Sequence, residues 1–239
     1  MRQATDKTLD KPSTKKPTRA KTASKTASKA KPTTRDPEGT RSALLSAAVA
    51  EFAREGYGGA RIDRISKAAL SHDRMVYYYF GSKEDLYRES IEWVYQSLVE
   101  AELKLELDLD RPVEALKAVI AFNWRYYIEH PELISILNTE NLYKARHIKG
   151  SKKVEQFASP QLATIQAILS KGVEARVFRA DFTAEQLFLT IASLTYFYLS
   201  NVHTLSNYLS RDLARASALD DWLAHVTRVV IDSLSRPSR

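Results

Sequence analysis

The segment Arg61–Lys83, which reads RIDRISKAALSHDRMVYYYFGSK, decides the fold of the chain. Its first half has apolar residues at three- and four-residue spacing, at Ile62, Ile65 and Ala69. This is the period of a short helix that buries one face. A break at Leu70-Ser71 follows, and the next run, His72–Tyr79, is rich in side chains that form hydrogen bonds. Two short helices separated by a tight turn predict a helix-turn-helix, whose second helix enters the major groove of DNA.

The second of these helices has its own start signal and its own apolar side. Asp73 stands where a side chain can accept the orphan backbone N–H groups of a first turn, so we expect it to be the N-cap. Met75, Val76 and Phe80 give the helix one apolar side. Tyr79 and Phe80 are expected to pack, at least in part, against the rest of the domain.

Together with its flanks, this segment resembles the DNA-binding domain of the TetR family of transcriptional regulators. The family's first helix ends in Phe-x-x-x-Gly-Tyr, as Phe52–Tyr57 does, and its second helix contains an Ile-Ala pair, here Ile65-Ser66. The family's recognition helix ends in Leu-Tyr-x-(His/Tyr)-Phe, which corresponds to Val76–Phe80, and a Ser-Lys-Glu helix start follows at Ser82–Glu84. The resemblance covers residues 40–98 without a gap.

One departure from the family lies in the turn of the motif. The family usually has glycine there, because a positive φ costs glycine little. This chain has Leu70 at that position, and Ser71 where an apolar residue is usual. Either the turn is built without a left-handed residue, or Leu70 carries some strain.

The resemblance and the side-chain chemistry together give a set of residues that we expect to contact DNA. The first turn of the recognition helix, residues 72–75, enters the major groove in this motif. Arg74 can reach O6 and N7 of a guanine with two hydrogen bonds. Lys83 stands at a helix start that favours phosphate, and Arg61 and Arg64 either clamp flanking phosphates or form a solvated face. The predicted set is Arg61, Arg64, His72, Asp73, Arg74, Met75, Tyr77, Tyr78 and Lys83.

The composition favours a helical globular protein. With 239 residues and 44% apolar content the chain is long enough to bury a real core. It has no cysteine, which excludes disulfides and thiolate chemistry. Helical periodicity dominates over strand alternation, so we predict an all-α fold of about nine helices, with an amino-terminal three-helix head and a helical ligand-binding and dimerisation body.

The net charge of +7 lies in the amino-terminal tail. Residues 1–39 hold 11 basic and 4 acidic residues, which leaves 25 basic (36 less 11) and 25 acidic (29 less 4) in the rest of the chain. We predict a disordered basic tail over 1–39, a TetR-type helix-turn-helix DNA-binding domain over 40–86 and a helical ligand-binding and dimerisation domain over 87–239. The tail is either a solvated extension or a cationic arm that holds DNA phosphates.

Further helices are expected over residues 40–56, 82–107, 113–130, 132–146 and 160–174, with a basic loop over 150–159. Thr183 followed by Gln186 predicts a capping box at the start of the next helix. Residues 187–199 are apolar nearly all round, which indicates burial on more than one side, and the run is too short and interrupted to span a membrane. The resemblance implies that this helix and the last one, over 219–234, form a four-helix dimer interface with a second copy.

The body contains Pro131-Glu132, then Asn138-x-Glu140-Asn141-Leu142, then Arg146. With this pattern the segment resembles a TetR subgroup that includes regulators of pyrimidine and nicotinate catabolism. Polar side chains between Asn138 and His147 stand on a helix that we expect to border a ligand pocket. Their amides and guanidinium suit a planar heterocycle or a carboxylate. The alternative is that they cap the helix and bond between subunits. The predicted ligand-binding set is Trp124, Tyr127, Asn138, Asn141 and Arg146.

Two DNA-binding functions fit these features. The first is a ligand-responsive repressor, a homodimer that is released from a palindromic operator by a small-molecule inducer. The alternative is an architectural DNA-binding protein that uses its lysine-rich tail with little ligand control. For either function we expect a cytoplasmic protein associated with the nucleoid and not with a membrane.

An enzyme is not expected. The five histidines show no HExxH spacing, and the chain contains neither a Gly-rich phosphate loop nor a Gly-x-Ser-x-Gly elbow. We therefore predict no catalytic residues, no metal and no cofactor.

Overall fold

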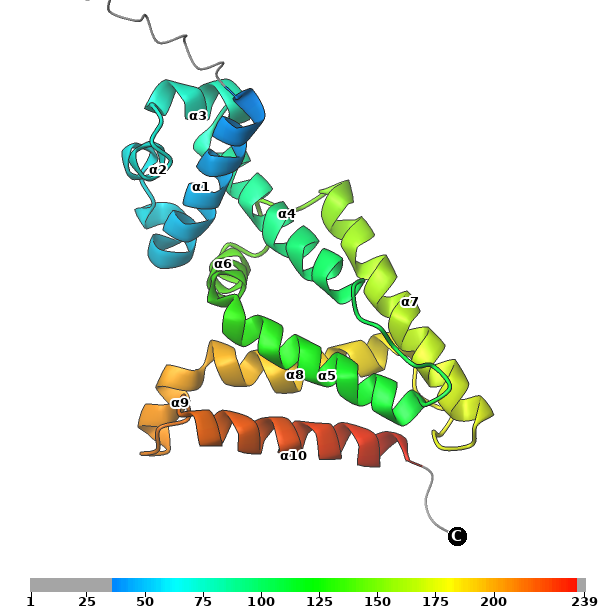
Figure 1. The fold of residues 1–239 in the computed structure, drawn as a ribbon. Coiled ribbons are helices and arrows are strands. Elements are labelled where there is room, and N and C mark those ends of the chain that lie inside the picture. The colour runs from blue at the N-terminus through cyan, green and yellow to red at the C-terminus, as the bar shows by residue number, and fades with distance from the viewer. Residues whose placement is uncertain (1–35, 236–239) are drawn as a thin grey trace, which may run out of the picture. The chain divides into compact units, whose positions relative to one another are not determined.

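A computed structural model describes residues 36–235, apart from the side chain of Ser159. Within these residues the protein has ten helices and no strand (Figure 1), which confirms the all-α prediction. A short helix, α9, follows α8 directly and brings the number to ten. Most of the predicted basic tail lies outside the described residues. The helices are α1 (Pro37–Gly59), α2 (Ile62–Ala68), α3 (Asp73–Phe80), α4 (Lys83–Glu102), α5 (Pro112–Glu129), α6 (Pro131–Leu142), α7 (Lys152–Glu174), α8 (Ala184–Ser200), α9 (Val202–Tyr208) and α10 (Ala216–Leu234).

The first three helices and the start of α4 share one hydrophobic core, and we call this part the head. Asp36 caps α1 by accepting the backbone N–H of Gly39 at 3.0 Å. The regular part of α1 stops at Gly56, whose φ of +65° is the conformation expected of a glycine that ends a helix. The same core continues into α6, and its largest fully buried side chains are Leu44, Phe52, Ile65, Leu86, Tyr87, Ile91, Leu133 and Ile136.

The turn between α2 and α3 uses a left-handed residue that is not glycine. Leu70 has a φ of +50°, and its side chain is 97% exposed. The backbone N–H of Ser71 donates to the carbonyl of Ser66 at 2.8 Å and closes the turn. Because the left-handed region costs an L-residue about 1–2 kcal/mol, the structure selects the alternative in which Leu70 carries strain.

Two helices of the body end earlier than predicted. The helix expected over 132–146 stops at Leu142, because Lys144 and Ala145 both have positive φ, +56° and +57°, and turn the chain back. The helix expected to reach residue 107 ends at Glu102.

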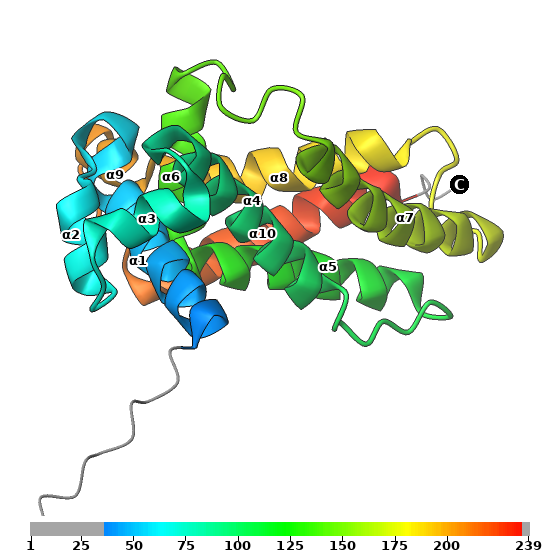
Figure 2. The same cartoon turned by 90° about the horizontal axis from the view of Figure 1, so that it is seen from above.

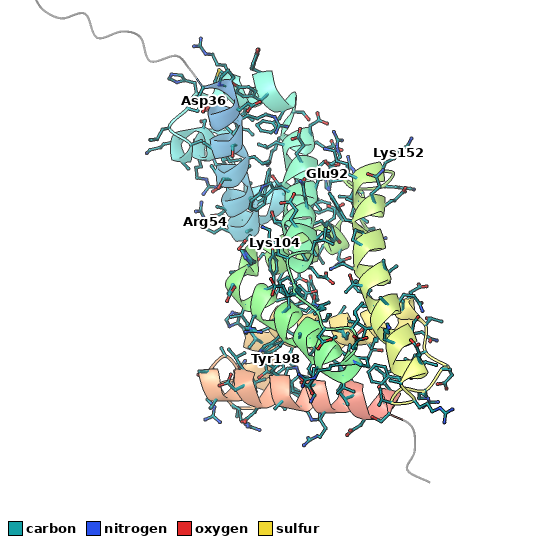
Figure 3. All side chains as sticks on the ribbon, turned by 45° about the vertical axis from the view of Figure 1, so that its right-hand side comes forward. Asp36, Arg54, Glu92, Lys104, Lys152 and Tyr198 are labelled. Carbon is teal, nitrogen blue, oxygen red and sulfur yellow. The ribbon has the colours of Figure 1, made fainter. Side chains whose placement is uncertain are left out.

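The segment predicted to be a basic loop, residues 150–159, is helical from Lys152 onward. Ser151 caps this start and donates from Oγ to Glu92 of α4 at 2.8 Å, and Lys153 Nζ lies 3.0 Å from the same carboxylate. Figure 3 shows Glu92 beside the first turn of α7. These contacts hold the first turns of α7 as helix although Pro160, inside it, lacks a backbone donor. The loop prediction was therefore wrong.

The carboxy-terminal helices form a second core with α5 and α7. The predicted capping box is confirmed, since Thr183 Oγ1 accepts the Gln186 N–H at 3.1 Å and the Gln186 side chain accepts the Thr183 N–H at 3.0 Å. α8 packs against α5, α7 and α10, which accounts for most of its apolar residues, whereas Leu189 and Phe197 stay exposed. The Trp222 indole of α10 donates to the carbonyl of Leu194 in α8 at 2.9 Å, and both views show the two helices side by side (Figures 1 and 2). No helix in the described part of the chain is long and apolar enough to cross a membrane.

Candidate nucleic-acid interface and ligand site

Helix α3 turns one side to solvent and the other to the head. Val76 and Phe80 are buried in the core, whereas Arg74, Tyr77 and Tyr78 are exposed, Tyr78 to 77%. Within residues 36–235 no acid pairs with Arg74, so its guanidinium is available to another molecule. A free arginine on an exposed helix offers the two parallel N–H donors that a guanine edge accepts. The exposed side of α3 thus carries three of the residues predicted to contact DNA.

The start of α3 differs from the prediction. His72 is at the N-cap position, and its side chain makes no capping bond. Asp73 instead accepts a hydrogen bond from the hydroxyl of Ser66 in α2, so the prediction that Asp73 caps the helix was wrong. Ser66 is buried and stands where the family pattern has Ala, which was the signal in the sequence for this contact. Met75, predicted to contact DNA, is half-buried against the core of the head.

Two cations flank α3 at its carboxy-terminal end. Lys83 stands in the first turn of α4, with its ammonium 5.0 Å from the centroid of the Tyr57 ring. Partial burial lowers the pKa of Lys83. Sequence reasoning missed Arg41, which lies over the Phe80 ring at 4.8 Å and pairs with Glu89. Ser82 Oγ accepts the Asp85 N–H at 3.0 Å, and Glu84 and Asp85 add negative charge to this turn. The two cations and the N–H groups that Ser82 does not cap favour an anion at this end of the head against those acids.

Arg61 and Arg64 both bond to acids of the head. The Arg61 guanidinium lies 3.0 Å from Asp63, which raises the pKa of Arg61 and lowers that of Asp63. Arg64 Nε lies 2.9 Å from the buried carboxylate of Glu51, and another of its nitrogens donates to the Gly59 carbonyl at 2.9 Å. A phosphate contact by Arg64 would have to compete with these bonds.

The structure brings together two of the five residues predicted to bind a ligand. Tyr127 of α5 is buried, and its ring meets that of Tyr196 in α8 edge-on, with 5.9 Å between centroids. The Tyr196 hydroxyl donates to Asn138 Oδ1 of α6 at 2.8 Å, and burial raises the pKa of Tyr196 to about 12. Tyr127 and Asn138 therefore share Tyr196 as a neighbour.

The other three predicted ligand residues lie elsewhere. Trp124 is buried against Tyr198 (labelled in Figure 3), at 5.6 Å between centroids, in an apolar cluster that includes Leu213. Asn141 and Arg146 are exposed, at the end of α6 and just beyond it. Among the described residues none of the three forms a hydrogen bond with Tyr127 or Asn138.

Sequence reasoning missed two polar residues beside Tyr127. Glu102, the last residue of α4, is buried and accepts a hydrogen bond from Gln161 of α7. Burial raises the pKa of the Glu102 carboxyl, and the bond from Gln161 opposes that rise. Burial also raises the pKa of Tyr127, and the nearby Tyr hydroxyls and the Glu102 charge add to the effect. We call the following five residues the interior polar cluster: Tyr95, Glu102, Tyr127, Gln161 and Tyr196.

A second buried polar group joins α6 to the head. One carboxylate oxygen of Glu140 accepts the backbone N–H of His147 at 2.7 Å, and the other lies 2.7 Å from Nδ1 of the same residue. The Tyr57 ring, which also lies under Lys83, is 4.5 Å from the imidazole. This junction links the body to a residue predicted to hold a DNA phosphate. Three tyrosine rings surround the imidazole, those of Tyr57, Tyr87 and Tyr143.

Comparison with known proteins shows which family this architecture belongs to. Residues 44–89 match the family described as bacterial regulatory proteins, tetR family, and residues 112–230 match the tetracyclin repressor-like C-terminal domain. The chain is 44% identical to the HTH-type transcriptional repressor NicS of Pseudomonas putida over 197 residues, 82% of this chain and 93% of that protein.

The chain belongs to the TetR family. A second TetR-type relative, the HTH-type transcriptional repressor SCO4008 of Streptomyces coelicolor, is 30% identical over 159 residues, 66% of this chain and 78% of that protein. The crystal structure of SCO4942 from Streptomyces coelicolor has the same fold, with a TM-score of 0.60 at 22% identity over 83% of this chain and 99% of the other.

The two TetR-family regions divide the described helices between them. The first covers most of the head, including α2 and α3, and the second runs from the start of α5 into α10. As a TetR-family member the chain is a ligand-responsive DNA-binding transcriptional regulator, and regulators of this family act as dimers. Among residues 36–235 no group of three or more His, Asp or Glu side chains is placed to hold a metal ion.

Proposed function

We propose that this TetR-family regulator is a repressor that binds an operator as a homodimer and leaves it when a small molecule binds. The observation that carries the proposal is the exposed side of α3, where Arg74, Tyr77 and Tyr78 stand on a helix whose other side is packed into the head. Two relatives, NicS and SCO4008, are transcriptional repressors, which supports repression over activation.

In the proposed complex α3 lies in the major groove of the operator. Arg74 donates to a guanine edge, and the hydroxyls of Tyr77 and Tyr78 bond to phosphates or to the edge of the groove. Lys83 holds a phosphate together with the N–H groups at the start of α4 that the Ser82 cap leaves open. Of the flanking arginines, Arg61 is the freer, since its acidic partner among residues 36–235, Asp63, is exposed.

The homodimer is proposed to form through α8 and α10. Leu189 and Phe197 of α8 and Val229 of α10 expose apolar area on the described surface, which a second copy would cover. A two-fold dimer places its two α3 helices in successive major grooves, so the operator should be palindromic.

The inducer is proposed to bind in the body, within residues 87–239, and to be a planar heterocycle or a carboxylate. Tyr127 and Asn138 are the best supported of the predicted ligand residues, because the first contacts the Tyr196 ring and the second accepts a hydrogen bond from the Tyr196 hydroxyl. Trp124, Asn141 and Arg146 stay predictions. The tail over residues 1–39 is proposed to add affinity for phosphates, and the protein to act on the nucleoid in the cytoplasm.

Selection of bound duplexes from random DNA tests this function. The full chain should enrich one palindromic site, and a variant that lacks residues 1–35 should enrich the same site with lower affinity and a weaker dependence on salt. If no sequence is enriched, or if sequence preference is lost together with the tail, the protein is not a repressor of this kind.

A further inference from the structure

The three buried carboxylates among residues 36–235 are not alike. Glu51 pairs with two arginines of the head, and Glu140 pairs with His147. Glu102 is 5% exposed, and within the described residues no Lys, Arg or His pairs with it. Its hydrogen-bond donor is the neutral amide of Gln161. A carboxylate removed from water without a counter-charge is unfavourable unless another group supplies one.

Two hydroxyls of the interior polar cluster are also unbonded. Tyr127 is 7% exposed, and its hydroxyl forms no hydrogen bond within the described residues; the same is true of the Tyr95 hydroxyl. The Tyr196 hydroxyl, in contrast, is bonded to Asn138. Tyr127 lies close enough to Glu102 for the charge of the acid to act on its hydroxyl. An unbonded hydroxyl and an acid without a counter-charge therefore lie together, and a ligand that carries both a donor and an acceptor would pair with both.

We propose that the interior polar cluster binds the inducer through Glu102, and that the inducer is a planar nitrogen base that presents a protonated nitrogen to this carboxylate. The inference rests on the proposed function and deepens it by naming the ligand class. Tyr127 lies beside the acid, and Tyr95 lies beside Tyr127, so the two rings and their unbonded hydroxyls suit the ring of such a base and an acceptor on it.

The charges in the interior favour a base over a free carboxylate. No Lys or Arg is buried in the described part of the chain, so the cluster has no buried cation to neutralise an anion. A protonated base supplies the missing positive charge, and its bond to a carboxylate is of the strong, charge-assisted kind. Of the two ligand classes considered above, the structure therefore favours the heterocycle.

A ligand at this position would act on the helices that hold the head. The cluster takes its residues from α4, α5, α7 and α8. Lys83 and Glu102 are the two ends of α4, about 28 Å apart at the helical rise per residue. A base bound at Glu102 therefore bonds to the same helix whose other end is proposed to hold a DNA phosphate.

Binding of 2-aminopyridine tests the inference, because its protonated form presents two adjacent N–H groups to a carboxylate. Nicotinate serves as the matched probe, a pyridine ring that carries an anion instead. Ligand-observed NMR on the full chain at millimolar concentrations, followed by calorimetry, should show that 2-aminopyridine binds more tightly than nicotinate. Glu102→Gln keeps the acceptor for Gln161 but removes the charge, and should weaken 2-aminopyridine about tenfold or more.

Two further variants keep the test decisive. Glu106→Gln, an exposed acid four residues further on, should bind 2-aminopyridine as the wild type does. Tyr127→Phe removes only an unbonded hydroxyl, so it should fold normally and bind the probe several-fold more weakly. If 2-aminopyridine does not bind, binds no better than nicotinate, or binds Glu102→Gln and Tyr127→Phe as it binds the wild type, the inference is wrong. Operator selection with the wild-type chain does not depend on these results, so it tests the proposed function separately from the ligand class.

Discussion

Replacement of Glu140 should destabilise the fold in a graded way. Glu140 makes two hydrogen bonds of 2.7 Å to His147, and both residues are buried. Glu140→Ala leaves a buried N–H and a buried ring nitrogen without partners, at about 1–3 kcal/mol each, so we expect a loss of roughly 3–5 kcal/mol in the free energy of unfolding. Glu140→Gln keeps an acceptor for the N–H and an amide that can bond to the ring nitrogen, and should lose about 1–2 kcal/mol.

Urea unfolding followed by far-UV circular dichroism measures these losses. Asn141→Ala, at the exposed neighbouring position, should stay within about 0.5 kcal/mol of the wild type. Operator affinity should also fall in Glu140→Gln, because the imidazole supports the Tyr57 ring that lies under Lys83. The argument is refuted if Glu140→Ala is within 1 kcal/mol of the wild type, a difference of about fivefold in the unfolding equilibrium.

Three more predictions concern single positions. Gly172→Ala should lower the free energy of unfolding by about 1–3 kcal/mol, because the new Cβ would lie 1.8 Å from the Phe178 ring, although alanine favours helix. Gly58→Ala, whose new Cβ would have no contact under 3.6 Å, should not lower it. Equal losses for the two variants in urea unfolding would contradict this prediction. Leu70→Gly should raise stability by ~0.5–1 kcal/mol, since relief of left-handed strain exceeds the entropy cost of glycine, whereas loss of stability would show that the strain is not there. Burial raises the pKa of Glu102, so its protonation stabilises the fold at low pH, and this contribution is lost as pH rises through the folded pKa. Glu102→Gln should therefore be more stable than the wild type by about 1 kcal/mol near pH 7. A difference in melting temperature between the two proteins that does not shrink toward acid pH would count against this prediction.

Local patterns were enough to predict most of the helices. The spacing of Ile62, Ile65 and Ala69 predicted α2, and Thr183 with Gln186 predicted the start of α8, because each signal lies within a few residues. The family resemblance added the side of α3 that faces outward. The resemblance also placed Leu70 where the family usually has glycine, but only the structure shows that Leu70 is left-handed there.

What the sequence could not show depends on partners far apart in the chain. The first turns of α7 are held by Glu92, about 60 residues earlier, so a basic segment before Pro160 was predicted to be a loop. Glu102 follows Leu98 by four residues on the buried stripe of α4, a signal that was present, but its partner Gln161 is 59 residues away. The predicted ligand set was likewise chosen from residues close in sequence, and Asn141 and Arg146 point to solvent because the chain turns after α6.

The central claim is that the exposed side of α3 reads the operator, and Arg74→Ala tests it most directly. Gel shifts on the selected operator should show a loss of about 1–3 kcal/mol in specific affinity, with preference relaxed at one base pair of each half-site. Size-exclusion chromatography should show the same dimer as the wild type. Arg125→Ala, an exposed arginine of α5 that bonds to its own helix, should bind the operator normally. Unchanged operator affinity in Arg74→Ala would contradict the account.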